Sequence, residues 1–307
     1  MGSLKRDLDW LKSKLEQLSK FTEKVASASD VHYEVHSWTP LKLIALMWWI
    51  DIYTKIIPKT KKYRANYWYI DLLAGPGTNR IKESGTIILG SPLIAVFFAR
   101  KPFTRYVFIE ADLAKANALK KRLSLLKIAK RTVVYADDCN TIIRELNITA
   151  SHFLAFIDCE GLDVVWETVE RLLRMRSDII VVFHTQSLRR TLGRAKKGYR
   201  DAERLTAFLG DEGWRDCGSA EDLLKLYEKK LGEHRSYVGC LRIRGDYEYD
   251  IILACRKGDY VEAWETLKEK YRRITSRDVE LALKILKGEV KALDEFLAGT
   301  TLEEFFG

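Results

Sequence analysis

An acid followed by a glycine-rich turn has the clearest chemical meaning in this sequence. In the stretch YIDLLAGPG, Asp71 ends an apolar run, and two leucines separate it from Ala74, Gly75, Pro76 and Gly77. Glycines lack side chains and so let a ligand approach the backbone closely. A dinucleotide fingerprint would have a third glycine where Arg80 stands, and a Walker loop would continue with Gly-Lys-Ser/Thr. The turn therefore favours a cofactor that is not held by phosphates.

Further acids follow the next apolar runs of the sequence. They are Glu110 after the second run, Asp137 and Asp138 after the third, and Asp158 after the fourth. The carboxyl ends of parallel strands share one edge of a sheet, where ligands bind. A carboxylate after the second strand can accept both ribose hydroxyls, and one after the third can accept an adenine amino group. The ordered acids predict a nucleoside cofactor, with Asp158 beside its reactive group.

The elements that must position these residues are strands alternating with helices. The expected strands are residues 67–74, 105–112, 132–138, 152–161 and 178–185. Helical patterns cover residues 91–100, 113–126, 140–146 and 164–175. Nearly continuous apolar strands between helices indicate a parallel sheet covered on both faces. Two later strands, within residues 236–258, are separated by GDYE and predict an antiparallel hairpin.

Five parallel strands followed by an antiparallel pair form the layout of class I S-adenosylmethionine (SAM) methyltransferases. A dinucleotide-binding Rossmann domain, as in a dehydrogenase, would normally continue with a parallel sixth strand. We therefore expect an α/β, class I methyltransferase-like Rossmann fold over residues 63–258. Leucines at helical spacing and a Pro-started helix from Leu41 to about Ile57 predict a helical N-terminal region, residues 1–62. Residues 259–307 predict a helical C-terminal extension.

Four motifs together resemble the three-Cys-motif partner family, a group of predicted class I methyltransferases. They are YIDLLAGPG, GSPLIA from Gly90, FIEAD and FIDCEGLD, preceded by residues 38–42 before a long helix. The resemblance covers about residues 36–260. It implies a SAM-dependent methyltransferase fold with Asp71, Gly75, Gly77 and Glu110 as cofactor residues. Family members often carry Asp-Pro-x-Gly where this chain has Asp158-Cys159-Glu160-Gly161, and this departure concerns the catalytic chemistry more than the fold.

The loop after Asp158 determines which acceptor the sequence predicts. In methyltransferases that act on exocyclic base amines, an acid and a backbone carbonyl accept the amine protons, and an aromatic ring stacks on the base. Asp158 and the Cys159 carbonyl hold the first two positions. Glu160 and His184 are further candidates for catalysis. The alternatives are a helix N-terminal acid for Glu160 and a core histidine at a strand end for His184. The stacking ring would have to come from elsewhere, with candidates Trp38, Trp166, Phe183 and His184.

Cys159 leaves a second chemistry open. A cysteine thiolate that adds to C6 of a pyrimidine would allow methylation at C5. The prolines that usually surround such a cysteine are missing here, and a small buried residue is the simpler interpretation. We expect N-methylation, with cytosine N4 as the preferred acceptor, and keep the C5 reaction as an alternative.

Charge indicates the acceptor molecule. The net charge is +9 with a pI near 9.1, which favours an anionic partner. Basic side chains crowd between the fifth strand and the hairpin, beside a tyrosine that could stack on a base. These predicted RNA-binding residues are Arg189, Arg190, Arg194, Lys196, Lys197, Tyr199 and Arg200. No DNA-groove motif is recognisable, so structured RNA is expected, with ribosomal RNA or a ribosomal subunit preferred.

Three other interpretations remain open at this stage. The acceptor could be a protein or small molecule, the chain could be a non-enzymatic RNA-binding or assembly factor on a methyltransferase fold, or it could be an NAD-dependent dehydrogenase. The five cysteines lack C-x-x-C spacing, so neither disulfides nor a metal is expected. No apolar run approaches the roughly 20 residues of a membrane span. A cytoplasmic protein is expected, and the Lys/Glu-rich, Gln-poor composition suggests a thermophile.

Overall fold

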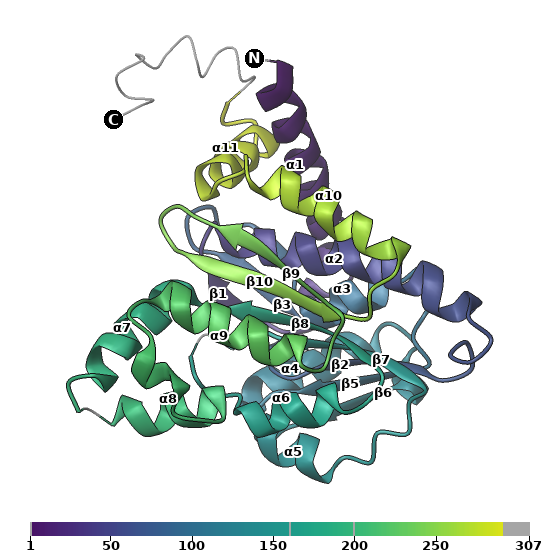
Figure 1. Ribbon diagram of the computed structural model, residues 1–307. Coiled ribbons are helices and arrows are strands. Elements are labelled where there is room, and N and C mark those ends of the chain that lie inside the picture. Colours follow the sequence, from purple (N-terminus) through teal and green to yellow (C-terminus); the bar gives the residue numbers. More distant parts are fainter. Residues whose placement is uncertain (1, 160, 199, 291–307) are drawn as a thin grey trace, which may run out of the picture.

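The central element of the computed structural model, which describes residues 2–159, 161–198 and 200–290, is a seven-stranded sheet (Figure 1). Its strand order is β6-β5-β2-β7-β8-β10-β9. The bounds are β2 (Tyr67–Asp71), β5 (Arg105–Ile109), β6 (Thr132–Tyr135), β7 (His152–Ile157), β8 (Ser177–Phe183), β9 (Tyr237–Ile243) and β10 (Tyr249–Cys255). The first five are parallel, and β10 is antiparallel to β8 and β9. The parallel sheet and the hairpin predicted from the sequence are confirmed.

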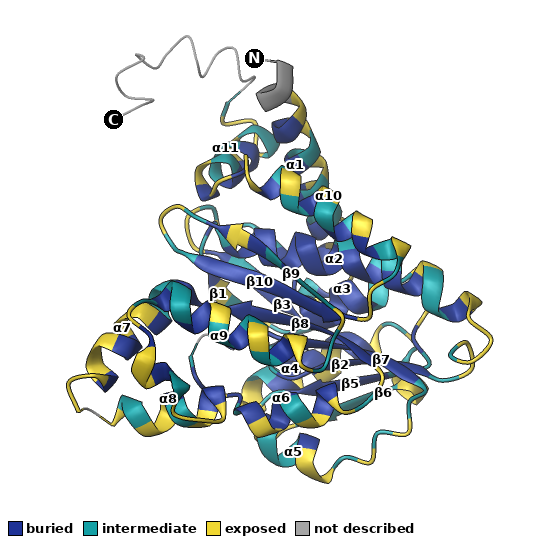
Figure 2. Cartoon of the chain, viewed as in Figure 1, coloured by how far each residue is buried: buried dark blue, intermediate teal, exposed yellow. Residues whose placement is uncertain are grey.

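Helices cover both faces of this sheet because its strands are apolar on both sides. In β7, Leu154 and Phe156 belong to one core cluster, while Phe153, Ala155 and Ile157 belong to the other. Figure 2 shows the sheet as the buried centre of the molecule. Helices α2 (Thr39–Ile56), α3 (Ser91–Phe97) and α4 (Leu113–Ser124) contribute to the first cluster. The second cluster includes α5 (Cys139–Glu145), α6 (Trp166–Leu173), α7 (Thr185–Ala195), α8 (Asp201–Leu209) and α9 (Ala220–Gly232).

A second, three-stranded sheet lies beside the glycine turn and was not predicted. It joins β1 (Tyr33–Val35), β3 (Thr78–Ile81) and β4 (Ile87–Leu89) in the order β1-β3-β4. From the sequence alone, residues 27–40 and the segment after Gly77 are expected to be loops. Instead, β1 pairs in parallel with β3, and β3 continues into an antiparallel pair with β4. This pairing fixes the N-terminal segment next to the turn.

Helices from both ends of the chain pack together above the sheet. They are α1 (Gly2–Lys20), α10 (Glu262–Tyr271) and α11 (Ser276–Leu286). Leu11 and Leu15 of α1 are fully buried, and Arg273 pairs with Asp7 at 2.7 Å. The Tyr271 hydroxyl donates to the Leu41 carbonyl at 2.6 Å, which ties these helices to α2. No described helix is long and apolar enough to cross a membrane.

Candidate functional site

The glycine turn after β2 is shaped by packing on one side and left open on the other. Gly75 and Gly77 have φ angles of +62° and +88°, a region that favours glycine. A Cβ on Gly77 would lie 2.9 Å from a Leu119 methyl carbon, whereas a Cβ on Gly75 would meet no atom within 4 Å. The buried Arg122 guanidinium holds the turn, donating to the Pro76 carbonyl at 2.8 Å and the Ser29 carbonyl at 2.7 Å. Gly75 therefore leaves space for a ligand.

That space is part of a cavity of about 240 Å³, hereafter the first cavity, at the carboxyl ends of the strands. Its lining includes Ala74, Gly75, Ser91, Glu110, Asp158 and Asp163. The predicted residues Ala74, Gly75, Glu110 and Asp158 are thus brought together. Ser91 and Asp163 were missed as site residues, although each lies within a motif quoted above. Residues from β1 and α2 close the opposite wall.

Glu110 connects the turn to the second strand of the parallel series. Its carboxylate accepts hydrogen bonds from the Gly75 amide at 2.8 Å and the Asp112 amide at 2.9 Å. Each carboxylate oxygen has further acceptor capacity. Glu110 therefore positions the backbone of Gly75 and can still accept hydroxyl groups from a ligand in the first cavity.

Asp71 lies beneath the turn and is fully buried. One carboxylate oxygen accepts from the Tyr69 hydroxyl at 3.0 Å, and the other has no hydrogen-bond partner among the described residues. Burial raises the pKa of Asp71 to about 7. Asp71 is not among the residues that line the cavity. Asp71 thus lies behind the turn, and its role as a cofactor residue stays a prediction.

The acids after the third strand make local backbone contacts in the structure, and their adenine contact stays a prediction. The Asp138 side chain is the N-cap of α5 and accepts from the Thr141 amide at 2.9 Å. Asp137 accepts from the Asp138 amide at 2.7 Å. Both residues are exposed, and neither lines the first cavity. Acids at the start of a helix often accept hydrogen bonds from its first free amides, and the Asp138 carboxylate does so here.

Asp158 forms an ion pair that the sequence analysis did not anticipate. Lys42 Nζ lies 2.8 Å from one carboxylate oxygen and 2.9 Å from the other, and His184 Nε2 lies 3.5 Å from Asp158 Oδ1. Burial alone would raise the pKa of Asp158, but Lys42 and His184 outweigh it and lower the pKa to about 2. A lone lysine within the apolar stretch TPLKLIALMWWI was the available signal, because a buried charge needs a partner.

A second cavity of about 330 Å³ adjoins the first, and Val35, Thr39 and Lys42 line both. It is rich in rings and basic groups, including His36, Trp38, Lys82, His184, Arg190 and Tyr247. Trp38 is stacked on His36, with centroids 4.3 Å apart, and on Tyr247, with centroids 5.3 Å apart. Of the predicted stacking candidates, Trp38 and His184 thus reach this cavity. Trp166 and Phe183 lie in the core on the other face of the sheet.

The surroundings of Cys159 disfavour its predicted alternative role as a nucleophile. The side chain is buried, and Sγ donates to the Gly161 carbonyl at 3.4 Å. Burial raises the pKa of the Cys159 thiol to about 12, whereas the C5 reaction needs a thiolate in contact with the base. Cys159 lines neither cavity. These features disfavour the C5 alternative, which stays a prediction. Glu160 lies outside the described residues.

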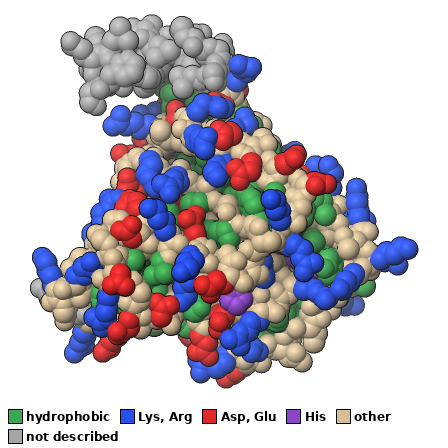
Figure 3. All heavy atoms as spheres, in the orientation of Figure 1, with side chains coloured by type: hydrophobic (Ala, Val, Ile, Leu, Met, Phe, Trp, Pro, Cys, Tyr) green, Lys and Arg blue, Asp and Glu red, His purple; other side chains and the backbone are tan. Residues whose placement is uncertain are grey.

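The predicted RNA-binding segment is only partly available to phosphates. Arg189 lies 2.7 Å from Glu248, and Arg194 lies 2.9 Å from Asp201, so acids offset both charges. Tyr199 lies outside the described residues. Figure 3 shows basic and acidic side chains interspersed over this face. Four members of the segment are exposed and form no ion pair in the described part of the chain: Arg190, Lys196, Lys197 and Arg200.

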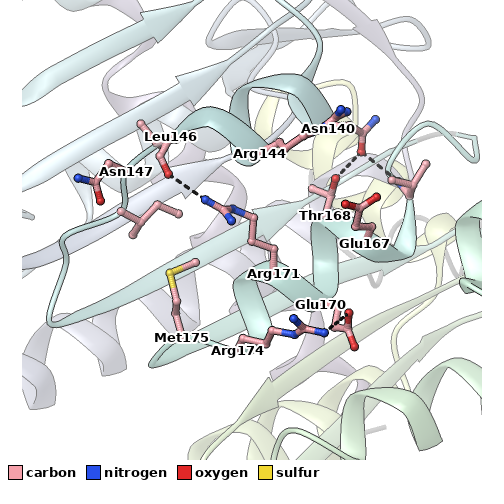
Figure 4. Close-up of a pocket in the computed structure, with 12 residues that line it drawn as sticks. Asn140, Arg144, Leu146, Asn147, Glu167, Thr168, Glu170, Arg171, Arg174 and Met175 are labelled. Atoms are coloured by element: carbon pink, nitrogen blue, oxygen red, sulfur yellow. Dashed lines mark hydrogen bonds and ion pairs between the residues drawn. The ribbon is translucent and has the colours of Figure 1, made fainter.

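A further cavity, of about 480 Å³ between α5 and α6, has a different character (Figure 4). Arg171 Nε donates to the Ile143 carbonyl at 2.8 Å, and Arg174 pairs with Glu170 at 3.0 Å. Asn140 accepts from the Thr168 hydroxyl at 2.7 Å. The Arg171 and Asn140 contacts link the two helices, and the Arg174–Glu170 pair lies within α6 and its C-cap, so we assign the polar groups here to packing.

The strand order defines the class of fold. Counted from β2 along the chain, the order is 3-2-1-4-5-7-6, with the seventh strand antiparallel to its neighbours. This is the class I methyltransferase-like Rossmann fold, as predicted, and the first cavity lies at the carboxyl ends of its strands.

No family model matches the sequence, and no curated protein matches it. Solved structures do match. LPL1258 from Legionella pneumophila is 14% identical, with 73% of this chain and 90% of that chain covered and a TM-score of 0.47. A candidate O-methyltransferase from Klebsiella pneumoniae is 13% identical, with 78% and 90% covered and a TM-score of 0.45. The O-methyltransferase TomG from Streptomyces achromogenes, in complex with SAM, is 15% identical, with 67% and 79% covered and a TM-score of 0.39. At these TM-scores, the fold class rests on the strand order of this chain.

Proposed function

We propose that this protein is a SAM-dependent methyltransferase that acts on structured RNA. The observation that carries the proposal is the pair of adjoining cavities at the carboxyl ends of the strands. The Lys42–Asp158 ion pair stands where they meet, since Lys42 lines both. One cavity has the glycine turn and acids expected of a nucleoside site, and the other has rings and basic groups.

The residues of the first cavity fit SAM. Gly75 leaves open space where any other residue would place a Cβ, and Glu110 is available beside it to accept ribose hydroxyls. When bound, SAM supplies a methyl group on a positively charged sulfur atom. Glu110 forms no ion pair in the described part of the chain and gives this cavity a negative charge, which suits a cationic centre.

An exocyclic base amine, with cytosine N4 preferred, is the acceptor that fits Asp158 as an orienting acid. A base in the second cavity could stack on the rings around Trp38, and Asp158 would accept a hydrogen bond from its amine. The nitrogen lone pair then faces the first cavity, and the proton lost on methylation passes to solvent or a neighbouring acid. In this geometry, Lys42 must give up one of its two contacts with Asp158.

A ribose hydroxyl is a second candidate acceptor, favoured by the position of Lys42. The ammonium group contacts both oxygens of Asp158, which leaves that carboxylate less free to hold an amine. A cation beside a hydroxyl stabilises the negative charge that develops on oxygen as the proton leaves. His184, 3.5 Å from Asp158, is placed to accept that proton.

RNA as the acceptor is supported by charge. Arg190 lines the second cavity, and Lys196, Lys197 and Arg200 continue the exposed basic surface beyond it. Such groups bind phosphates and release counterions. Ribosomal RNA or a ribosomal subunit remains the preferred target within this class.

Two measurements test the proposal. Calorimetry should detect SAM binding to the purified protein, and absence of binding at high SAM concentration would favour a non-enzymatic RNA-binding factor. Mass spectrometry of RNA nucleosides from a strain lacking the gene should then show one missing methylated nucleoside. Loss of N4-methylcytidine supports the amine acceptor, loss of a ribose-methylated nucleoside supports the hydroxyl acceptor, and an unchanged profile would contradict an RNA substrate.

A further inference from the structure

A basic cavity lies at the other end of the strands of the main sheet, away from the candidate site. It has a volume of about 590 Å³ and includes His152 at the start of β7 and Ser177 at the start of β8. The antiparallel strand β10 ends at the same edge, so Arg256 and Lys257 also line it. Because β7 rises about 3.3 Å per residue, this cavity lies about 20 Å from Asp158. It is therefore separate from the two cavities described above.

Three cations of this cavity have no acidic partner among the residues that the structure describes. Arg176, Arg256 and Lys257 are exposed and form no ion pair within residues 2–159, 161–198 and 200–290. Arg174, on the same rim, differs because it pairs with Glu170 at 3.0 Å. Arg256 and Lys257 follow each other directly in the chain, so β10 holds two like charges at this edge.

The floor of the cavity does not neutralise these charges. Arg235 donates to the carbonyls of Leu173, Met175 and Ser177, which leaves its positive charge without a carboxylate contact. Burial raises the pKa of nearby Asp178 to about 7, so this acid carries only part of a charge near neutral pH.

The pKa of His152 reflects the combined charge of three arginines near this cavity. Its Nδ1 lies 2.9 Å from the Tyr53 hydroxyl, and its pKa is lowered to about 4 by burial and then by the charges of Arg235, Arg256 and Arg176. Three arginines from different parts of the sheet edge therefore act on one imidazole.

We propose that this cavity binds a phosphate group. Guanidinium groups match the geometry of phosphate oxygens and can donate two hydrogen bonds to it at once. Arg176 and Arg256 supply such groups from neighbouring strand ends, and Lys257 adds a third charge. The phosphate belongs either to a free nucleotide or to the backbone of an RNA strand. Because the site is remote from Asp158, its occupancy can be measured without SAM or turnover, independently of the proposed function.

The test is a titration of the whole protein with inorganic phosphate and AMP, followed by calorimetry and by the imidazole resonances of His152. The double variant Arg176→Gln/Arg256→Gln should weaken AMP binding at least about tenfold, as expected for two charge-assisted contacts. Lys120→Gln/Lys121→Gln removes the same charge from exposed positions of α4 and should leave AMP binding within about twofold. Both changes lie at exposed positions, and thermal melts check that the variants remain folded.

A short RNA oligonucleotide distinguishes the two sources. If it displaces AMP and binds more tightly, the phosphate is that of an RNA backbone, and if AMP binds more tightly, the site belongs to a nucleotide. Adenosine, which lacks the phosphate, should leave the His152 resonances unchanged in either case, including when it enters the first cavity. Equal weakening by the two double variants, or an unperturbed His152 resonance in saturating phosphate and AMP, would overturn the proposal.

Discussion

The first and second cavities meet at Lys42 but are assembled in different ways. The lining of the first comes largely from segments that follow strands, such as the turn at Gly75 and the acid at Glu110. The second joins Trp38 before α2, His184 after β8 and Tyr247 before β10, which are far apart in the sequence. The residues of the proposed cofactor site can therefore be recognised from short stretches of sequence. Those of the proposed acceptor site come together only through the packing of distant segments.

The two cavities also differ in charge. The first contains Glu110, Asp158 and Asp163, of which Asp158 pairs with Lys42 and Asp163 with Arg204 at 3.3 Å. Among the described residues, the second contains Lys42, Lys82 and Arg190 and one acid, Glu34, which pairs with Arg80 at 3.2 Å. This difference in charge favours a cationic ligand in the first cavity and an anionic ligand in the second. Variants in each cavity should therefore separate SAM binding from RNA binding.

The largest effect is expected where the cavities meet. Asp158→Ala should lower turnover by at least about 100-fold, because it removes the group that orients the acceptor. It also leaves Lys42 buried without a partner, which costs about 3–5 kcal/mol of unfolding free energy. Methyl transfer from labelled SAM and chemical denaturation measure the two losses.

A double variant separates catalysis from folding at this ion pair. Asp158→Ala/Lys42→Met should regain most of the stability but none of the activity, and SAM affinity should change little in either protein. Recovered or retained activity would refute the catalytic assignment of Asp158. Because its pKa falls from 3.8 to about 2 on folding, the ion pair stabilises the wild type above about pH 4 and is lost between about pH 4 and 2. The double variant lacks the ion pair, so its free energy of unfolding should not show this loss between about pH 4 and 2.

The next largest effect concerns the first cavity alone. Gly75→Ala would place a methyl group in the space left for SAM and should weaken SAM binding about tenfold or more. Gly85→Ala is the matched control, because Gly85 has a similar φ of +66° and open surroundings but lies in the β3–β4 turn. Calorimetry should show weaker SAM binding only for Gly75→Ala, and equal affinities would place SAM elsewhere.

The main sheet was predictable because its strands are apolar runs bounded by helices. The small sheet was not, since β1 and β4 have three residues each, too few to show an alternating pattern. Within the site, Gly75 lies in the turn after β2, and Glu110 and Asp158 directly follow β5 and β7. Their positions after successive strands were enough to identify them. Lys42 and Tyr247 were missed as site residues, since only tertiary packing brings them near Asp158 and Trp38. The order of residues in the sequence does not determine that Asp138 caps a helix. Nor does it determine that Arg189 and Arg194 form ion pairs with acids.

A smaller effect is expected in the second cavity alone. Trp38→Ala should raise the KM for RNA about tenfold, because stacking contributes about 1–3 kcal/mol per base, and should leave SAM binding unchanged. Trp10→Ala provides the control, as Trp10 is also partly buried but lies in α1. Steady-state kinetics at saturating SAM give the comparison. An unchanged KM for RNA would place the base outside the stack of His36, Trp38 and Tyr247.

Arg190 and Arg194 provide a finer comparison within the basic segment. Arg190→Gln should weaken RNA binding about threefold and reduce the salt dependence by about one phosphate contact. Arg194→Gln removes the same charge from a residue already paired with Asp201 and should change RNA affinity less than about twofold. Filter binding over a range of salt concentrations measures both. Equal effects would mean that RNA responds to the overall charge of the segment and not to the edge of the second cavity.

The smallest effect is expected at Cys159, although it follows Asp158 directly. Its thiol is buried, donates to Gly161 and has a pKa raised to about 12, so a serine could replace it as a hydrogen-bond donor. Cys159→Ser should therefore keep turnover within about twofold of wild type, with a stability loss of about 1 kcal/mol from burying a hydroxyl. Thermal melts and methyl-transfer rates give both values. Complete loss of activity in a folded Cys159→Ser protein would restore the C5 mechanism and move the acceptor base to the other side of the Asp158 loop.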